Sequence, residues 1–183
     1  MYIGKECGKI YIGAGCTKLT ERSIDLRVIV FSDTHGNMGA ADKIISDNIS
    51  CDHFLFLGDG VAEIEILRSK YPDKNIFCVA GNCDKCDAPT SMVIELYNTK
   101  IFMTHGHLCG VNESTDELVK LAAKEKADIA LFGHTHKRYN KEEKGIYVLN
   151  PGSASLPKDG EPASCAFIDI SLYGISCMII DLT

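Results

Sequence analysis

The chain has 183 residues, of which 45% are hydrophobic, and its 19 Lys and Arg against 25 Asp and Glu give a net charge of −6. A chain of this length can bury about 70% of its unfolded surface, so one hydrophobic core can form without disulfides. The acidic balance argues against binding long nucleic acid, which requires a basic face.

The sequence predicts neither a membrane span nor a secretion signal. No apolar run approaches the roughly 20 residues of a transmembrane helix. The N-terminal segment, residues 1–26, carries Lys and Glu where a signal peptide needs an apolar stretch. We therefore expect a cytoplasmic protein without a membrane partner. Residues 1–26 are treated as an N-terminal extension whose order the sequence leaves open.

The nine cysteines are an odd number and are scattered along the chain. Several lie inside apolar runs, such as Cys78 in IFCVA and Cys177 in ISCMII, where a free thiol packs as a small hydrophobic side chain. Because no secretion signal is predicted, we expect free thiols and no disulfide framework.

Residues 27–183 are expected to form one α/β domain, because apolar strands alternate with helices and no repeat or linker interrupts them. The β-branched run LRVIVF predicts a buried first strand. HFLFLG predicts the second strand. VAEIEILRSKY predicts an amphipathic helix that ends before Pro72, and NIFCVA predicts the third strand.

The second half of the chain continues with a hairpin. SMVIELY and KIFMTH are its strands, with the turn at Asn98 and Thr99. STDELVKLAAKEKA predicts a helix that a capping box opens, from Ser114 to Glu117. Four more strands are predicted for ADIALFG, GIYVLNP, SCAFIDIS and ISCMIIDL, the last two joined through residues 172–174.

Five segments share one form, an apolar strand that ends in Gly, Asp, Asn or His: FSDTH, LGD, AGNCD, MTHGH and FGHTH. In an α/β sheet the carboxyl ends of neighbouring strands meet at one crevice, where ligands bind. The chain has six histidines, and only His53 lies outside these segments. The pattern therefore predicts one site built from several strand ends.

The side chains of these segments suit divalent metals. The candidate ligands are Asp33, His35, Asp59, Asn82, His105, His134 and His136. Carboxylates, imidazoles and an amide oxygen together favour ions of intermediate character, such as Mn, Fe, Ni, Co or Zn. Seven ligands are too many for one ion. Two ions about 3.5–4 Å apart, bridged by a carboxylate and a water, would use them all.

The ordered motifs DTH, GD, GNCD, HGH and GHTH resemble those of the calcineurin-like metallophosphoesterases, in which D-x-H, G-D, G-N-[HCD]-D, H and G-H-x-H build a di-metal site. The chain is most similar to the small single-domain phosphodiesterases of that superfamily, and NPGS, residues 150–153, is similar as well. The resemblance covers residues 27–183. One such motif would be weak evidence, whereas five in order are specific.

The resemblance implies an α/β fold in which two β-sheets form a sandwich flanked by helices, an αββα four-layer arrangement. It also implies two ligand sets with Asp59 as the bridge: Asp33, His35, Asp59 and His136 for one metal, and Asp59, Asn82, His105 and His134 for the other. Two divalent ions per chain are expected, with manganese first and nickel, iron, cobalt or zinc as alternatives.

The implied activity is hydrolysis of a small phosphodiester by a hydroxide that bridges the metals and attacks phosphorus in line. Asn82, Cys83 and Asp84 are the expected catalytic residues. Many relatives have a histidine at the Cys83 position, which assists the leaving group. A thiol, with an unperturbed pKa of about 8.5, is a weaker proton donor, and an inert thiol is the alternative. Asp84 would orient neighbouring groups.

Cys83 and Cys86 also have the C-x-x-C spacing of a zinc or redox pair. A structural zinc site needs four ligands, and no second C-x-x-C is present. A thioredoxin-like pair opens a helix, whereas Ala88 and Pro89 follow here at once. We therefore expect neither function, and Cys86 is interpreted as a bystander.

A different function on the same fold stays open. A subunit of the retromer sorting complex shares this fold as a scaffold after losing part of its metal site, so a catalytically weak scaffold is the alternative. Every expected ligand type is present here, which favours catalysis. Metal storage is disfavoured because a mixed, bridged ligand set is not a closed structural site. The resemblance also makes a homo-oligomer plausible.

Some neighbouring residues have several interpretations. His107 lies two residues after His105, and phosphate contact, support of the ligands and plain packing all remain open for it. Asn37 is expected to cap the helix that follows. Lys137 and Arg138 could attract a phosphate, but a solvated surface pair is the preferred interpretation.

Overall fold

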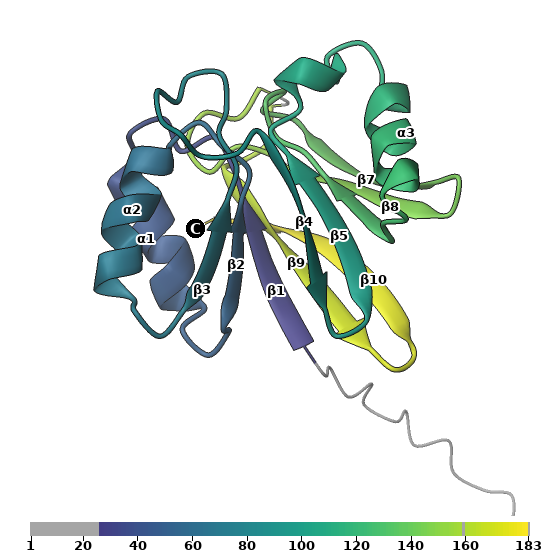
Figure 1. Cartoon of the computed structure of the whole chain (residues 1–183). Helices are drawn as coiled ribbons and strands as arrows, with labels where there is room; N and C mark the ends of the chain where they lie inside the picture. Colours follow the sequence, from purple (N-terminus) through teal and green to yellow (C-terminus); the bar gives the residue numbers. More distant parts are fainter. Residues whose placement is uncertain (1–25, 159, 183) are drawn as a thin grey trace, which may run out of the picture.

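The computed structural model describes residues 26–158 and 160–182, which form two β-sheets and three α-helices (Figure 1). Apart from Leu26, the predicted N-terminal extension lies outside the described residues. The first sheet has the strand order β10-β9-β1-β2-β3. Its strands are β1 (Leu26–Phe31), β2 (His53–Phe56), β3 (Asn75–Cys78), β9 (Ser164–Ser171) and β10 (Gly174–Asp181).

The second sheet has the strand order β4-β5-β6-β8-β7. Its strands are β4 (Ser91–Leu96), β5 (Thr99–Thr104), β6 (Ile129–Leu131), β7 (Arg138–Glu143) and β8 (Ile146–Pro151). Strands β1, β2 and β3 run parallel in the first sheet, as do β5, β6 and β8 in the second. The carboxyl ends of these parallel strands therefore lie at one edge of each sheet.

The helices cover the outer faces of the two sheets. Helices α1 (Met38–Asp47) and α2 (Val61–Lys70) pack on the first sheet, and α3 (Asp116–Lys124) packs on the second (Figure 1). A short 3-10 helix, η1 (His107–Cys109), precedes α3.

The buried side chains divide into three clusters that match these layers. Alternate residues of β1 point to opposite faces, so Ile29 packs against α1 and α2 while Val28 and Val30 pack between the sheets. Phe102 and Val148, on the opposite face of the second sheet, pack against α3. The predicted αββα four-layer sandwich is confirmed.

The hairpin and the third helix differ locally from their predictions. The turn between β4 and β5 is made by Tyr97 and Asn98, with φ of 49° and 60°, one residue earlier than predicted. The prediction of a capping box at α3 is wrong, because the N-cap is Thr115 and its side chain makes no capping bond. The Ser114 hydroxyl instead accepts from the backbone N–H of Asp116.

Strand β7 was not predicted, because RYNKEE has no alternation of apolar and polar residues. It forms the edge of the second sheet and pairs antiparallel with β8. Lys144 and Gly145 make the turn with φ of 52° and 79°. The interpretation of Arg138 as a solvated residue is also wrong, because its guanidinium lies 2.7 Å from Asp181 and donates to the carbonyl of Pro162.

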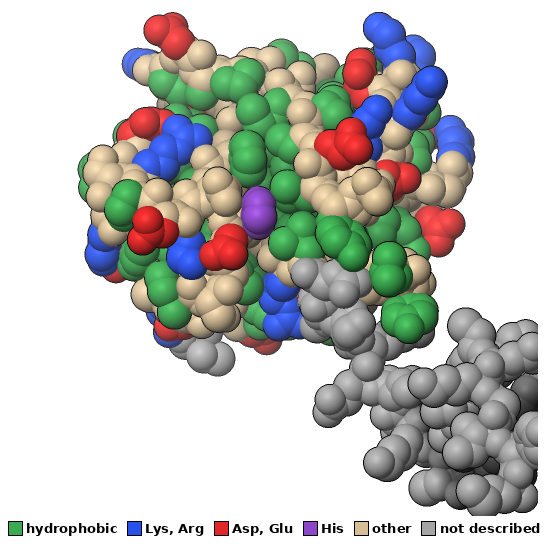
Figure 2. Space-filling view, turned by 60° about the horizontal axis from the view of Figure 1, so that its bottom comes forward, with side chains coloured by type: hydrophobic (Ala, Val, Ile, Leu, Met, Phe, Trp, Pro, Cys, Tyr) green, Lys and Arg blue, Asp and Glu red, His purple; other side chains and the backbone are tan. Residues whose placement is uncertain are grey.

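The surface agrees with the acidic balance of the sequence. On the face of the molecule shown in Figure 2, basic and acidic side chains alternate with hydrophobic ones instead of forming a continuous basic surface. Within the described residues, no helix is long and apolar enough to cross a membrane.

Helix α2 offers a matched test of the packing. Ile64 is fully buried against the first sheet, whereas Ile66, two residues later, is 60% exposed. Replacement of Ile64 by Ala should lower the free energy of unfolding by about 2–5 kcal/mol. Ile66→Ala should change it by no more than about 0.5 kcal/mol. Urea denaturation measures both, and equal losses would contradict the packing of α2.

Candidate metal centre

The candidate ligands lie on loops at the carboxyl ends of five parallel strands. The loop after β1 carries Asp33 and His35, and the loop after β2 carries Asp59. Backbone hydrogen bonds join these two loops: the N–H of Asp33 donates to the carbonyl of Gly58 (3.0 Å), and that of His35 to the carbonyl of Asp59 (2.9 Å). The two loops are therefore held in a fixed register.

The remaining candidate ligands come from the loops after β3, β5 and β6. Asn82 follows β3, His105 follows β5, and the pair His134 and His136 follows β6. The backbone N–H of His134 donates to Asp33 Oδ2 over 3.2 Å, which links the second sheet to the first. The site thus lies across the top of both sheets.

Five of the seven candidate ligand residues have a left-handed backbone. They are Asp33 (φ 57°), His35 (46°), Asp59 (58°), His134 (66°) and His136 (56°). Non-glycine residues adopt this region rarely, and such conformations cost of order 1–3 kcal/mol each. The surrounding structure must impose them, and their concentration here marks a functional site.

Two glycines allow the loops to approach each other. A Cβ at Gly81 would lie 2.1 Å from Asp59 Oδ1, and one at Gly133 would lie 2.1 Å from the hydroxyl oxygen of Ser32. Both distances are far below van der Waals contact. The motifs AGN and FGH therefore need glycine to bring their next residues to the site.

A first cluster of polar atoms forms around Asp33. Its Oδ1 lies 3.3 Å from His136 Nε2 and 3.8 Å from His35 Nε2, and the two Nε2 atoms are 3.1 Å apart. Asp33 is fully buried, and its Oδ1 has no hydrogen-bond partner within the described residues. An orphaned buried carboxylate oxygen facing two imidazole nitrogens fits a bound cation.

A second cluster forms around Asp59. Its Oδ2 lies 3.7 Å from His35 Nε2 and 3.5 Å from His105 Nε2, and Asn82 Oδ1 lies 3.2 Å from the same nitrogen of His105. Asp59 therefore touches a histidine of the first cluster and one of the second. This position suits a ligand shared by two cations.

Backbone carbonyls orient two of the histidines. His105 Nδ1 donates to the carbonyl of Leu57, and His136 Nδ1 to that of Leu156, both over 2.7 Å. In the neutral imidazole the Nε2 lone pair is then free and points into the cluster. This arrangement, in which one ring nitrogen is anchored and the other faces a metal, is usual for ligating histidines.

His134 lies at the rim of the site. Its ring is 5.2 Å from the ring of His105, and its Nε2 is 3.1 Å from the side-chain nitrogen of Asn112. It is absent from the three groupings of His, Cys and acidic side chains whose ligand atoms lie within 4.8 Å of one another. The other five His and Asp candidates each belong to at least one of these groupings.

The pKa directions reflect the mutual attraction of carboxylates and imidazoles. Burial raises the pKa of Asp59, but hydrogen bonds from His105 and from the backbone N–H of Cys83 outweigh it and hold the pKa well below its usual range. Burial lowers the pKa of His105, and its contacts with Asp59 and Asp33 reverse that shift and raise it. The pKa of His136 is raised, chiefly by Asp33. The site therefore attracts positive charge.

Cys83 lies at the exposed edge of the second cluster. Its backbone N–H donates to Asp59 Oδ1 over 2.8 Å, and Asn82 donates to its sulfur over 3.3 Å. The hydrogen bond with Asp59 and burial raise the pKa of the thiol, which stays protonated at neutral pH. Cys86 is also exposed, and both thiols are free.

Asp84 organises the loop backbone instead of pointing at the cluster. Its Oδ2 accepts from the N–H groups of Asp59 and Gly81, both at 2.8 Å, and its Oδ1 accepts from those of Gly60 and Val61, both at 2.9 Å. Val61 is the first residue of α2, where a carboxylate is favourable. Asp84 therefore fixes the turn that presents Asp59.

Three supporting residues could not be found by sequence reasoning alone. Glu63 in α2 accepts from the Thr34 hydroxyl (3.0 Å) and from the N–H of Gly36 (2.7 Å). Asn112 contacts His134, and the Ser155 hydroxyl donates to the carbonyl of Thr34 over 2.9 Å. None lies in a strand-end motif, and no sequence signal marks any of them.

The NPGS segment supports the site from the second sheet. Ser153 donates to the carbonyl of Asp33 over 2.8 Å, and Asn150 donates to that of Gly133 over the same distance. These contacts explain why this segment accompanies the five motifs. Asn37, as predicted, caps α1 by accepting from the N–H of Ala40.

His107 lies beside the site. Its ring is 5.4 Å from that of His105 and 6.2 Å from that of His134. Its buried Nδ1 has no hydrogen-bond partner within the described residues. Burial lowers the pKa of this imidazole, which favours its neutral form.

An open pocket of about 480 Å³ gives access to the cluster. Its wall includes five of the candidate ligands (His35, Asp59, Asn82, His134 and His136), together with Leu156 and Lys158. This volume lies within the range of sites for small molecules.

Comparison with known proteins identifies the family. Residues 26–172 match the calcineurin-like phosphoesterase superfamily domain. "Phosphodiesterase YfcE" of Escherichia coli strain K12 is 28% identical over 175 residues, which cover 82% of this chain and 91% of that protein.

Solved structures show the same fold. A conserved protein of Streptococcus pneumoniae, described as a predicted phosphoesterase, matches with a TM-score of 0.74 and 31% identity over 85% of this chain and 89% of that one. Wild-type Vps29 of Entamoeba histolytica, complexed with zinc, matches with a TM-score of 0.65 and 24% identity over 85% of this chain and 99% of that one. The chain belongs to the calcineurin-like phosphoesterase superfamily.

Proposed function

We propose that this chain is a phosphodiesterase that works with two divalent cations, held in the two clusters and shared through Asp59. The observation that carries the proposal is the convergence of imidazole nitrogens and carboxylate oxygens on two adjacent points. His35 Nε2 and His136 Nε2, only 3.1 Å apart, face the orphaned oxygen of Asp33. A cation bound between these groups would satisfy the orphaned oxygen and both imidazoles.

The proposed ligand sets follow the two clusters. Asp33, His35, Asp59 and His136 would hold one cation, and Asp59, Asn82, His105 and His134 would hold the other. The distances within the first set, and those among Asp59, Asn82 and His105, support this assignment of ligands. His134 would complete the second set from the rim, where its Nε2 lies 3.1 Å from the side-chain nitrogen of Asn112.

The expected metal is manganese, with nickel, iron, cobalt or zinc as alternatives, because nitrogen and oxygen ligands of this kind accept all of them. The zinc bound by the Vps29 relative is consistent with a divalent-metal site on this fold. When bound, a pair of such cations supplies hydroxide at neutral pH and offsets the charge of the phosphoryl oxygens.

The protein's own residues position the substrate and handle the proton. The amide nitrogen of Asn82, which here donates to the Cys83 sulfur, would donate to a phosphoryl oxygen of the bound substrate. Cys83, which is exposed and whose pKa is raised, would give a proton to the departing alkoxide. Because a thiol is a weak acid, the preferred substrates should be diesters with good leaving groups.

The proposed substrate is a small phosphodiester, which the curated phosphodiesterase relative favours. We further propose that the protein acts in the cytoplasm without long nucleic acid or membrane as partner, and that it can form a homo-oligomer.

A scaffolding role is the second candidate, and it is favoured by one observation. Leu172 and Tyr173, at the tip of the β9–β10 hairpin, are 81% and 78% exposed. Vps29 proteins share this fold. The candidate ligand set of this chain is complete, however, so scaffolding would accompany catalysis instead of replacing it.

Metal-dependent turnover tests the proposal. After chelation and reloading with Mn²⁺, the protein should hydrolyse bis-p-nitrophenyl phosphate much faster than p-nitrophenyl phosphate. Asp59→Asn and His134→Ala should each lower kcat/KM about a hundredfold or more, because each removes a cation ligand. His53→Ala, which removes the histidine at the start of β2, is the matched control and should keep full activity. No hydrolysis with any divalent metal would contradict the proposal.

The role of Cys83 is tested by leaving groups of different acidity. Cys83→His should raise the rate on methyl phenyl phosphate about tenfold or more, because imidazolium is a better proton donor. The rate on methyl p-nitrophenyl phosphate, whose leaving group needs no proton, should change little. Cys83→Ser, which removes the thiol without adding an imidazole, is the control. If Cys83→His leaves both esters unchanged, proton donation from this position is not limiting.

A further inference from the structure

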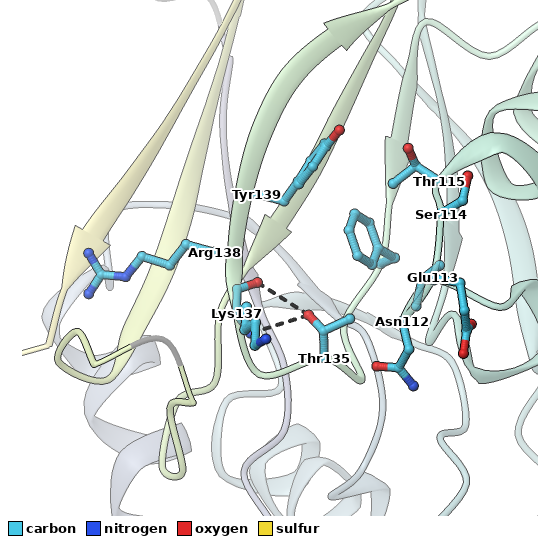
Figure 3. A pocket seen from close by; sticks show the side chains of 10 residues that line it. Asn112, Glu113, Ser114, Thr115, Thr135, Lys137, Arg138 and Tyr139 are labelled. Carbon is cyan, nitrogen blue, oxygen red and sulfur yellow. Dashed lines mark hydrogen bonds between the residues drawn. The ribbon is translucent and has the colours of Figure 1, made fainter.

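A second pocket of about 420 Å³ adjoins the candidate metal centre on the side of the second sheet. Figure 3 shows its wall, which is formed by the segment 111–115 before α3, by Phe132, Thr135 and Lys137, and by the first two residues of β7. Its size lies within the range of small-molecule sites.

The pocket begins directly beside a candidate ligand. Asn112 belongs to its wall, and the side-chain nitrogen of Asn112 lies 3.1 Å from His134 Nε2. Thr135, another wall residue, lies in the chain between the histidines of the G-H-T-H motif. A group attached to a phosphate at the metal centre can therefore extend into this pocket.

The inner wall is apolar and aromatic. Phe132 and Val111 are buried, with 2% and 7% exposure, and the rings of Phe132 and Tyr139 pack edge to face at 5.8 Å. The Tyr139 hydroxyl donates to Glu143 Oε1 over 2.6 Å, and the same carboxylate accepts from the Thr115 hydroxyl. The aromatic wall is therefore held in place before any ligand binds.

The polar groups at the rim balance each other in charge. Lys137 and Glu113 line the pocket, and neither has an ion-pair partner among the described residues. Arg138 points away from the other labelled side chains in Figure 3 and is engaged with Asp181. One cation and one anion do not select a second phosphate, but they suit a neutral group with hydroxyls and ring nitrogens.

We propose that this pocket binds the nucleoside part of a nucleotide diester whose phosphate lies at the metal centre. The inference rests on the proposed phosphodiesterase function and names its substrate class. The base packs on Tyr139, since aromatic side chains bind bases through their faces. Glu113 accepts a hydrogen bond from a sugar hydroxyl, and the Asn112 amide can donate to one or accept from one.

Two esters with the same leaving group test this proposal. They are the p-nitrophenyl ester of thymidine 5′-monophosphate and methyl p-nitrophenyl phosphate, assayed with the Mn²⁺-loaded protein. Tyr139→Ala should lower kcat/KM for the nucleotide ester about tenfold and leave the methyl ester unchanged, because only the former loses a stacked base. Tyr139→Phe keeps the ring and loses only the bond to Glu143, so its loss on the nucleotide ester should be smaller than that of Tyr139→Ala.

Glu113→Gln should also lower kcat/KM for the nucleotide ester and leave that for the methyl ester unchanged. Glu117→Gln, a change on α3 outside the pocket, is its matched control. If a pocket variant slows both esters by the same factor, the pocket does not bind the nucleoside. Circular dichroism melting shows whether each variant is folded.

A binding measurement separates this proposal from the proposed activity. Thymidine 5′-monophosphate should bind the unmodified protein in calorimetry and bind Tyr139→Ala about tenfold more weakly. This comparison stands even if neither ester is hydrolysed, an outcome that would count against the activity alone. Equal affinity for both proteins, or no binding to either, would overturn the nucleoside pocket.

Discussion

The site depends on a carboxylate, Asp59, held ionised and almost fully buried where the two sheets meet. Its Oδ2 faces His35 from one cluster and His105 from the other, and its backbone is fixed by Asp84. Taking an ionised carboxylate out of water is costly unless positive charge or hydrogen bonds compensate. Hydrogen bonds from His105 and from the backbone N–H of Cys83 supply this compensation, and a pair of divalent cations would add to it.

The rest of the fold serves to keep these groups in position. The parallel strands bring five loops to one edge, and the glycines allow the loops to touch. Buried polar contacts then fix the loop backbones: Glu63 holds the segment after Asp33, and Ser153 holds the carbonyl of Asp33. Such contacts stabilise the left-handed backbone conformation of five candidate ligands.

The sequence predicted what depends on local pattern. Apolar runs ending in polar residues predicted the strand ends, and because parallel strands share an edge, they also predicted that Asp33, Asp59 and His105 would meet. The family and the four-layer fold are confirmed. Which ions bind, and through which of the seven candidates, stays a prediction.

The features that sequence reasoning missed depend on tertiary contacts. Strand β7 is an edge strand of polar residues, stabilised by pairing with β8 instead of by an apolar face. The side chain of Asn112 meets His134 across 22 positions of the chain. At α3 the capping box failed because the Thr115 hydroxyl is engaged with Glu143 in β7, a contact that no local motif reveals.

In the proposed site two cations are coupled through one carboxylate, and electron paramagnetic resonance of the Mn²⁺-loaded protein tests this directly. At two equivalents of Mn²⁺ per chain, the spectrum should show an exchange-coupled pair, because a bridging carboxylate holds the ions about 3.5–4 Å apart. The coupling should disappear in Asp59→Asn. A spectrum of isolated Mn²⁺ ions at two equivalents of the unmodified protein would contradict the shared site.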